Sequence, residues 1–324
     1  MELLNEIWQT AQRNKLRTAL TGFAVAWGIF MLIVLLGAGN GLINAQVKQS
    51  SRFLSNSMMV FGGQTNKPYQ GLQEGRYVQL EERDIHTTAN DFAGTVDEVG
   101  AVTSQYGQTV SFGQQYITGT LTGVYPNHFN IEKTEMLYGR FINQIDMQLQ
   151  RKVIVLGNNH VRELLNIQTS THNSQLSTLI GQYVKVGNFA FRVVGIYKER
   201  ENGSADPFVP YTTLKAVYGK GKDAGRIEFT FHGLETEQQN KQFERTYQQH
   251  LGANHQVAPD DDAFWLWNRY TQSMQMQEGI GIIRMALWIV GLFTLLSGIV
   301  GVSNIMLITV KERTHEFGIR KAIG

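Results

Sequence analysis

Two long runs without charge lie near the ends of the chain. No Asp, Glu, Lys or Arg occurs over 18–47 or over 285–310. The second run has 26 residues. As a helix it would extend roughly 39 Å, which exceeds the ~30 Å hydrocarbon core of a bilayer. The pattern predicts transmembrane helices over 18–45 and 281–310.

A cleaved signal peptide is the alternative for the first run. Arg13, Lys15 and Arg17 precede the run, as the positive residues of a signal do. The apolar region of a signal is about 7 to 15 residues long, however, and this run is much longer. Its length favours an uncleaved membrane helix.

Positive residues flank both predicted spans on the side of the chain ends. Besides the three before the first span, they are Lys311, Arg313, Arg320 and Lys321. Positive flanks lie in the cytoplasm, which places 46–279 on the other side of the membrane. Arg284, one turn into the predicted span 281–310, is predicted to reach the outer headgroups.

The first 17 residues carry apolar positions at helical spacing. Leu3, Leu4, Ile7 and Trp8 fall on one face, which predicts an amphipathic helix over 1–17 that lies on the cytoplasmic surface of the membrane. Trp8 would then sit among the lipid headgroups. The alternative is a helix that packs on a soluble neighbour.

The central segment contains short apolar runs bounded by glycine. Strands are predicted in SMMVFGG, GTLTGVYP, KVIVLG and RIEFTFHGL, and YVKVGNFAFRVVGIY predicts two strands around a turn at Gly187. Helical spacing occurs in LEERDIHTTANDF, NHVRELLN, YTTLKAVYG and ETEQQNKQFERTYQQHLG. The fold class predicted is a membrane protein whose helices flank a two-lobed α+β domain. We expect 133–210 to form an inserted strand-rich lobe and stalk helices to cover about 46–57 and 262–280.

Composition narrows the range of possible functions. The net charge is +2, which gives no argument for a nucleic-acid partner. No cysteine is present, so disulfides, thiol catalysis and cysteine-based metal sites are excluded. The 33 glycines against 5 prolines favour strands and turns in the centre of the chain.

Motifs of enzyme chemistry are missing from the sequence. It has no G-x-x-x-x-G-K-[ST], H-E-x-x-H or G-x-S-x-G, and YGKGKDAG lacks the spacing of a phosphate-binding loop. We therefore expect no catalytic residue, metal or cofactor in this chain, and we expect any ATP and Mg²⁺ to be bound by a separate ATPase.

Three clusters of polar or aromatic residues have more ordinary interpretations. His250 and His255 with the run 260–262 could hold a metal, but a solvated loop or helix cap is the commoner role. The acidic run with Asp84 is interpreted as the exposed first turn of a helix; its other members are Glu81 and Glu82. Several aromatic residues could line an apolar groove, although packing is the commoner role; they are Tyr69, Tyr77, Phe264, Trp265 and Trp267.

The ends and centre of the chain together resemble a known family. NKLRTALTGFAVAWGIF leads into the first span, and the second span ends in VKERTHEFGIRKAIG. This arrangement resembles the permeases of the MacB and FtsX type of ABC transporter. In the centre, TGVYPNHFN, LYGRFINQIDMQLQRKVIVLGNNHVRELL and PFVPYTTL are similar to the periplasmic core domain of that family. The resemblance covers nearly the whole chain.

The resemblance implies a mechanical role at the bacterial inner membrane. Members of the family dimerise, which implies a second copy or a paralogue as a partner, and some work with a periplasmic adaptor. A cytoplasmic ATPase binds where the second span emerges. Carried over by position, the segment 311–324 would contact it through Glu312, Arg313, Glu316, Phe317, Gly318, Ile319, Arg320 and Lys321.

The residues of this tail agree with that implication. Glu316 and Arg320 are four positions apart and can form an ion pair on a helix. Phe317 and Ile319 are apolar groups that a partner would cover. The alternative is a plain positive anchor together with Lys311, which leaves these two apolar residues unexplained.

The functional hypothesis is a permease that exports or extracts a drug, peptide or lipoprotein by mechanotransmission. Two alternatives are a regulator of a cell-wall enzyme, similar to FtsX, and a two-span receptor that senses a ligand. Family members have four spans and this sequence has two. We therefore expect a piece of a longer permease, whose third and fourth spans follow Gly324; a functional two-span permease is the less expected alternative.

Overall fold

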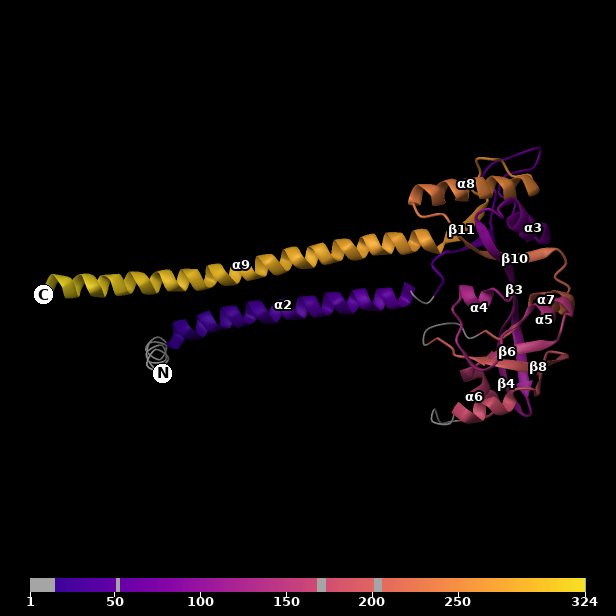
Figure 1. Cartoon of the computed structure of the whole chain (residues 1–324), viewed down its shortest axis with the longest axis horizontal. Coiled ribbons are helices and arrows are strands. Elements are labelled where there is room, and N and C mark those ends of the chain that lie inside the picture. The colour runs from indigo at the N-terminus through magenta and orange to yellow at the C-terminus, as the bar shows by residue number, and fades with distance from the viewer. Residues whose placement is uncertain (1–14, 51–52, 168–172, 201–205, 324) are drawn as a thin grey trace. The chain divides into compact units, whose positions relative to one another are not determined.

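A computed structural model describes residues 15–50, 53–167, 173–200 and 206–323. The chain divides into two compact units. One, the helical unit, combines Met1–Ser50 with Met274–Gly324, and the other, the central domain, is Ser51–Ser273. Figure 1 shows the elements of each. The amphipathic helix predicted over 1–17 falls mostly outside the described residues.

Two long helices make up the described part of the helical unit. They are α2 (Lys15–Ser50) and α9 (Arg269–Ile323), the latter with 55 residues. Neither contains proline, which would interrupt the backbone hydrogen bonds of a helix. Both include a stretch long and apolar enough to cross a membrane, Val25–Lys48 and Arg269–Ser303. These stretches overlap the predicted spans 18–45 and 281–310, and their bounds differ from the predicted ones.

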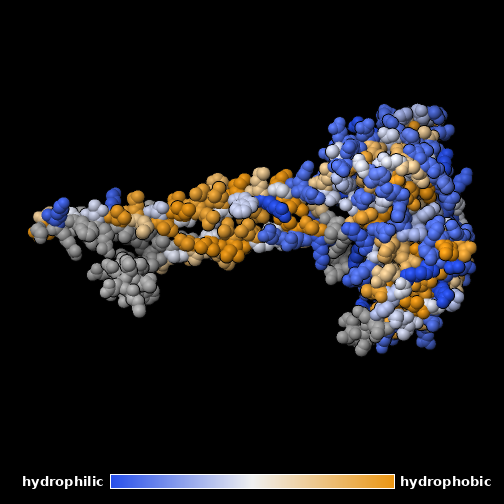
Figure 2. Space-filling model, viewed as in Figure 1, coloured by the Kyte–Doolittle hydropathy of each residue, from blue (hydrophilic) through white to orange (hydrophobic). Residues whose placement is uncertain are grey.

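The apolar side chains of these two helices are mainly exposed. Trp27, Ile33, Trp288 and Phe293 are among them. Figure 2 shows hydrophobic residues along the helical unit, whereas hydrophilic residues are prominent on the central domain. A surface of this kind is stable in lipid and unstable in water. The exposure therefore agrees with a membrane-embedded pair.

Glycine allows α2 and α9 to come close at two points. A Cβ built on Gly39 would lie 2.3 Å from Cδ1 of Leu287, and one on Gly291 would lie 2.9 Å from Cδ1 of Leu32. A larger residue at Gly39 would force the Leu287 side chain to move. Small residues at such contacts are typical of helices that pack together in lipid.

In the described residues of the central domain, eleven strands form one sheet. Its main path runs β11-β1-β10-β3-β4-β9-β6-β8-β5, while β2 pairs with β10, and β7 pairs with β3 and β8. Pairing is antiparallel except for β4 with β9 and β6 with β8. The strands are β1 (Ser57–Gly62), β2 (Leu80–Glu81), β3 (Val96–Phe112), β4 (Gln115–Val124), β5 (Met136–Gly139), β6 (Val153–Gly157), β7 (Tyr183–Val186), β8 (Phe189–Tyr197), β9 (Phe208–Pro210), β10 (Asp223–Phe231) and β11 (Phe264–Asn268).

Two hydrophobic clusters pack against this sheet. The first cluster joins β1, β10 and the start of β3 to α3 and α8, through residues such as Phe229 and Tyr247. The second cluster surrounds β6 and β8, and Phe191 is fully buried within it. The second cluster includes Val110 and Ile117, which lie outside the predicted lobe 133–210. The helices are α3 (Glu82–Asp91), α4 (His128–Ile131), α5 (Gln144–Gln148), α6 (Asn158–Leu164), the 3-10 helix η1 (Asn173–Leu179), α7 (Tyr211–Tyr218) and α8 (Glu237–Asn254).

Several predicted elements of the central domain are confirmed. The four helical segments correspond to α3, α6, α7 and α8. The two strands around Gly187 are β7 and β8, and Val186 pairs with Phe189 across the turn. Gly187 has a φ of 56°, a conformation that glycine adopts without steric cost.

The stalk-helix prediction is wrong at its domain-side ends. Residues 53–56 are not helical, and β1 begins at Ser57. Phe264–Asn268 forms β11, an edge strand that pairs with β1. Its aromatic residues suit an extended strand better than a helix, and the pairing with β1 satisfies its backbone. Helix α9 therefore begins only at Arg269.

Candidate functional site

The predicted coupling residues lie near the end of α9. Lys311, Gly318, Ile319 and Lys321 are exposed there. Lys311, Thr314, Gly318 and Ala322 follow helical spacing along one face, which borders a shallow hollow. The other predicted members lie on α9, but their side chains fall outside the described part of the structure; they are Glu312, Arg313, Glu316, Phe317 and Arg320.

The predicted membrane anchors are distributed along both helices. Lys15 is exposed at the start of α2, and Arg284 is exposed on α9. Arg17 lies on α2, but its side chain falls outside the described part. Trp8 and Arg13 lie outside the described residues.

The start of α9 is fixed to the central domain by a buried ion pair. Arg269, its first residue, donates from Nη2 to Oε1 of Glu132 over 2.6 Å. Only 5% of the Arg269 side chain and 13% of the Glu132 side chain are exposed. Arg269 also donates from Nη1 to the carbonyl of Ile131, 3.3 Å away. The arginine therefore joins α9 to the end of α4.

A second arginine and an aromatic ring complete this contact. Arg200 donates from Nη1 to Oε2 of Glu132 over 3.1 Å, and from Nη2 to the Glu132 carbonyl. Both arginines lie over the ring of Phe53. The guanidinium carbon of Arg269 is 4.1 Å from the ring centroid, and that of Arg200 is 4.7 Å from it. Cation–π contacts of this kind gain strength when they are removed from water.

Asn268 caps the helix and ties it to α8. Its Oδ1 accepts from the backbone N–H of Tyr270 over 3.0 Å and of Thr271 over 3.2 Å. Its Nδ2 donates to Asn240 and to Glu244, both on α8. A side-chain oxygen at this position satisfies N–H groups that lack a partner within the helix. We call Phe53, Glu132, Arg200, Asn268 and Arg269 the α9 joint.

Charge in the α9 joint favours the ionised form of Glu132. Burial alone would raise the pKa of this carboxyl, but the charges of Arg269, His128 and Arg200 and the Arg269 hydrogen bond together lower it. The joint therefore holds a carboxylate between two guanidinium groups. Breaking such a pair leaves a buried charge without compensation, which is the costly case.

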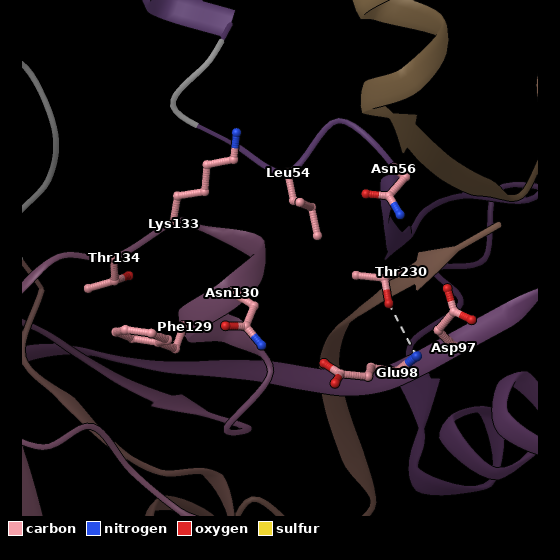
Figure 3. A pocket seen from close by; sticks show the side chains of 9 residues that line it. All are labelled: Leu54, Asn56, Asp97, Glu98, Phe129, Asn130, Lys133, Thr134 and Thr230. Carbon is pink, nitrogen blue, oxygen red and sulfur yellow. Dashed lines mark hydrogen bonds between the residues drawn. The ribbon is translucent and has the colours of Figure 1, made fainter.

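A hollow with charged, polar and apolar residues in its lining lies beside α4 (Figure 3). It has a volume of about 490 Å³, and an adjoining hollow of about 330 Å³ shares Glu98 and Asn130 with it. Leu54 and Phe129 contribute apolar walls. Figure 3 shows Glu98 extending from β3 and Asn130 projecting from α4. We call the two together the α4 hollow.

The residues considered for a metal site make separate contacts. His255 Nε2 lies 2.7 Å from Oδ2 of Asp84, and His250 lies beside Asp91. Asp260 pairs with Lys67, and Asp261 accepts from the backbone of Asn66. Among the described residues no three His, Cys, Asp or Glu side chains form a group that could hold a metal ion.

Asp84 was expected to be exposed, and this expectation is wrong. It is fully buried, and its Oδ2 accepts from the backbone N–H of Glu81 in a capping box at the start of α3. Asn254 donates to its other oxygen over 3.0 Å. Contacts with His255 and Asn254 compensate for burial, and they join α3 to the end of α8.

The aromatic residues considered for a groove divide between core and surface. Phe264 is buried, while Trp265 is exposed and packs between Phe61 and Trp267. Tyr77 is exposed and donates to the carbonyl of Gly62. Tyr69 forms a bridge with Leu72. These contacts support packing along the edge of the sheet.

Sequence reasoning did not identify the α9 joint or the α4 hollow. Arg269 was placed inside a predicted stalk helix, and Glu132 carried no motif. One signal was available: Asn268 is a preferred N-cap residue directly before a long helical pattern.

The comparisons with known proteins identify the family. The sequence model of the MacB-like periplasmic core domain matches residues 18–244. The chain belongs to the MacB-type family of ABC transporter permeases. Permeases of this family are embedded in a membrane and carry a periplasmic domain. In this chain that domain corresponds to the central domain, which two apolar helices flank.

Curated relatives match the chain along its length. The macrolide export ATP-binding/permease protein MacB of Bdellovibrio bacteriovorus is 26% identical over 335 residues, covering 100% of this chain and 49% of the relative. MacB of Escherichia coli K12 is 25% identical over 332 residues, and the match covers 100% of this chain and 47% of that relative. A probable syringafactin export protein of Pseudomonas syringae, SyfD, is 23% identical and covers 98% and 46%. The chain spans about half the length of these relatives.

Two solved structures have a similar fold. The periplasmic region of MacB from Actinobacillus actinomycetemcomitans superposes with a TM-score of 0.54 at 19% identity, covering 72% of this chain and 98% of that one. The extracellular domain of the transporter YknZ from Gram-positive bacteria gives 0.52 at 18% identity, covering 66% and 100%. Both likenesses concern the fold of the MacB-like domain.

Proposed function

We propose that this MacB-type chain is the permease component of an ABC transporter of the bacterial inner membrane. An ATP-binding subunit on the cytoplasmic side binds ATP and Mg²⁺, and its cycle moves the periplasmic domain through the membrane helices. The chain acts as a dimer with a second copy or a paralogue, and a periplasmic adaptor completes the assembly. The substrate is a drug, peptide or lipoprotein. Export as the activity is supported by the names of two relatives, a macrolide export protein and a probable syringafactin export protein.

The observation that carries this proposal is the continuity of α9. One helix without proline begins in the central domain at Arg269 and extends through the apolar stretch to the predicted coupling residues. A continuous helix transmits force along its axis because every turn is hydrogen-bonded to the next. A displacement at the cytoplasmic end would therefore reach the first turn of α9.

The α9 joint is the part that would pass this displacement to the sheet. Asn268 and Arg269 connect the first turn of α9 to α8 and to the end of α4. Through β11 the same segment continues into the pairing with β1. Because buried hydrogen-bonded contacts resist gradual deformation, the residues of the joint would follow a displacement of the first turn of α9.

The cytoplasmic end of α9 would be the contact with the ATP-binding subunit. Ile319 is exposed on this segment, and Phe317 lies two positions before it. An apolar residue within a charged segment is typical of the centre of a protein interface. The Lys and Arg residues around it would form the rim and keep the segment in the cytoplasm.

A distance measurement tests the proposal. The sequence has no cysteine, so spin labels attach only at introduced positions. Labels at Lys15→Cys on α2 and Tyr183→Cys on β7 report the distance between helix and domain in the full chain, reconstituted with its ATP-binding partner. We expect this distance to change on ATP binding and to return after hydrolysis. An unchanged distance in all nucleotide states would contradict the proposal.

An export assay, with the chain and its ATP-binding partner reconstituted in lipid vesicles, separates transport from regulation. A permease of the proposed kind moves its substrate only while ATP is hydrolysed. Movement of the domain without any export would favour a regulator of a cell-wall enzyme.

A further inference from the structure

The α4 hollow has the features of a ligand site that the proposed function does not use. Residues of β3, β10 and α4 line it, together with the segment before β1 and the segment after α4, which contributes Lys133 and Thr134. Its two parts meet at Glu98 and Asn130. Figure 3 shows the Leu54 side chain reaching into the space above these residues.

Glu98 presents a carboxylate to the hollow. Its backbone N–H donates to Oγ1 of Thr230 over 3.2 Å, which holds this part of β3 in place. Within the described residues its carboxylate makes no hydrogen bond or ion pair. Asp97, the adjacent acidic residue, is paired with His232 over 2.7 Å. Lys133 also lines the hollow, and Figure 3 shows its ammonium directed away from Glu98. The carboxylate without a partner among the described residues of the hollow is therefore that of Glu98.

Asn127 adds a buried amide without a partner. It is 9% exposed and lines the smaller part of the hollow. Neither its Nδ2 nor its Oδ1 has a hydrogen-bond partner within the described part of the chain. The side chain packs on Gly100, where a Cβ would lie 2.3 Å from Oδ1. A buried amide without partners costs free energy that a ligand can recover.

A second buried acceptor lies close by on the same face of the sheet. Glu228 of β10 is directly opposite Gly100 of β3, and directly opposite residues share a face. His128 Nδ1 lies 2.8 Å from Oε1 of Glu228. Oε2 of Glu228 is buried and has no partner among the described residues. Hydrogen-bond acceptors without donors in the described part of the chain therefore occur at Asn127, which lines the hollow, and at Glu228, which does not line it but lies on the same face of the sheet.

We infer that the α4 hollow binds an organic cation, namely an ammonium group attached to an apolar body. The ammonium would donate to the Glu98 carboxylate and to the amide oxygens of Asn127 and Asn130. The apolar body would lie against Leu54 and Phe129. A metal ion fits less well, because the described residues offer no group of three charged or imidazole ligands.

The inference does not rest on the proposed function. It concerns binding to the central domain alone, and its test needs neither ATP nor transport.

Two probes that differ only in charge test the inference. We choose 4-phenylbutylamine and its neutral counterpart 4-phenylbutan-1-ol, titrated into the purified full chain in detergent by calorimetry. A charge-assisted hydrogen bond is worth enough to make the amine bind at least about tenfold more tightly than the alcohol. Equal binding of the two, or no binding of the amine, would overturn the inference.

Variants assign the binding to the hollow. Glu98→Gln keeps the shape of the side chain and removes its charge, so the preference for the amine should disappear. Asn130→Ala should weaken amine binding severalfold. Glu135→Gln is the matched control, because Glu135 is exposed and paired with Lys198 outside the hollow. A preference that survives in Glu98→Gln, or that Glu135→Gln removes equally, would show binding elsewhere and would refute the inference.

Discussion

Arg269 and Glu132, which are 137 positions apart in the sequence, form a buried ion pair of 2.6 Å at the first residue of α9. The pair joins the helix that carries the second apolar stretch to the domain that is similar to the periplasmic region of MacB. Arg200 contacts the same carboxylate from the segment after β8. The first residue of α9 is therefore held within the central domain by contacts from two distant segments.

Loss of the Arg269 side-chain charge should destabilise the central domain. Arg269→Met keeps most of the apolar stem but leaves Glu132 buried beside one arginine. We expect a decrease of roughly 3 kcal/mol in the free energy of unfolding, the magnitude typical of a broken buried pair. Urea denaturation of the full chain, followed by Trp fluorescence, measures it. Lys198→Met is the control, since its exposed pair with Glu135 should contribute less than about 1 kcal/mol.

Acidic pH should remove the contribution of the same pair. The folded-state pKa of Glu132 is lowered from its ordinary value of 4.5, so its stabilisation is present above that value. It is lost as the pH falls through the folded pKa. The difference in the free energy of unfolding between wild type and Arg269→Met should be constant near neutral pH and should shrink below pH 4.5. A difference that stays the same at pH 7 and at the lowest pH where both variants fold would contradict this.

Two glycines with positive φ should respond very differently to alanine. A Cβ on Gly225, where φ is 72°, would lie 2.3 Å from the Val102 carbonyl oxygen on β3. Gly219, where φ is 62°, has open space around it. Gly219→Ala should lower the free energy of unfolding by about 1 kcal/mol, from backbone strain alone. Gly225→Ala should cost at least about twice as much, because β3 and β10 must separate. Equal thermal stability of the two variants would argue against the register of these strands.

The helices and the hairpin of the central domain could be predicted because their signals are local. Gly187 supplied a turn between two apolar strands, and the capping box of α3 lies within a few residues. The long strand β3 escaped prediction because its outward positions are polar, as at Glu98 and Gln105. Strand β11 was taken for helix because it has five residues and no glycine boundary.

The candidate sites could not be predicted from sequence for a different reason. The α9 joint brings together residues from segments that are distant in the chain, such as Phe53, Glu132 and Arg200. The α4 hollow depends on Asn127 lying over Gly100, a contact that only the folding of the sheet creates. Without a motif of fixed spacing, such clusters carry no signal along the chain.

The apolar core of the tail should be required for coupling. Phe317→Asp places a charge where we propose that the ATP-binding subunit packs, and desolvating it would weaken the contact. We expect loss of co-purification and loss of the stimulation of ATP hydrolysis by the permease. Ile323→Asp is the matched control, since Ile323 is an exposed apolar residue on α9 beyond the coupling core. Wild-type coupling in Phe317→Asp would show that this residue does not contact the subunit.

The most direct test of the account compares domain movement in wild type and in Arg269→Met. Both carry spin labels at Lys15→Cys and Tyr183→Cys, and the rate of ATP hydrolysis is recorded on the same samples. We predict that the ATP-dependent change in the distance between the labels is present in wild type. In Arg269→Met it should be lost, although ATP hydrolysis continues and the domain remains folded at the temperature of the measurement. An identical distance change in both proteins would contradict the claim that the α9 joint transmits the movement.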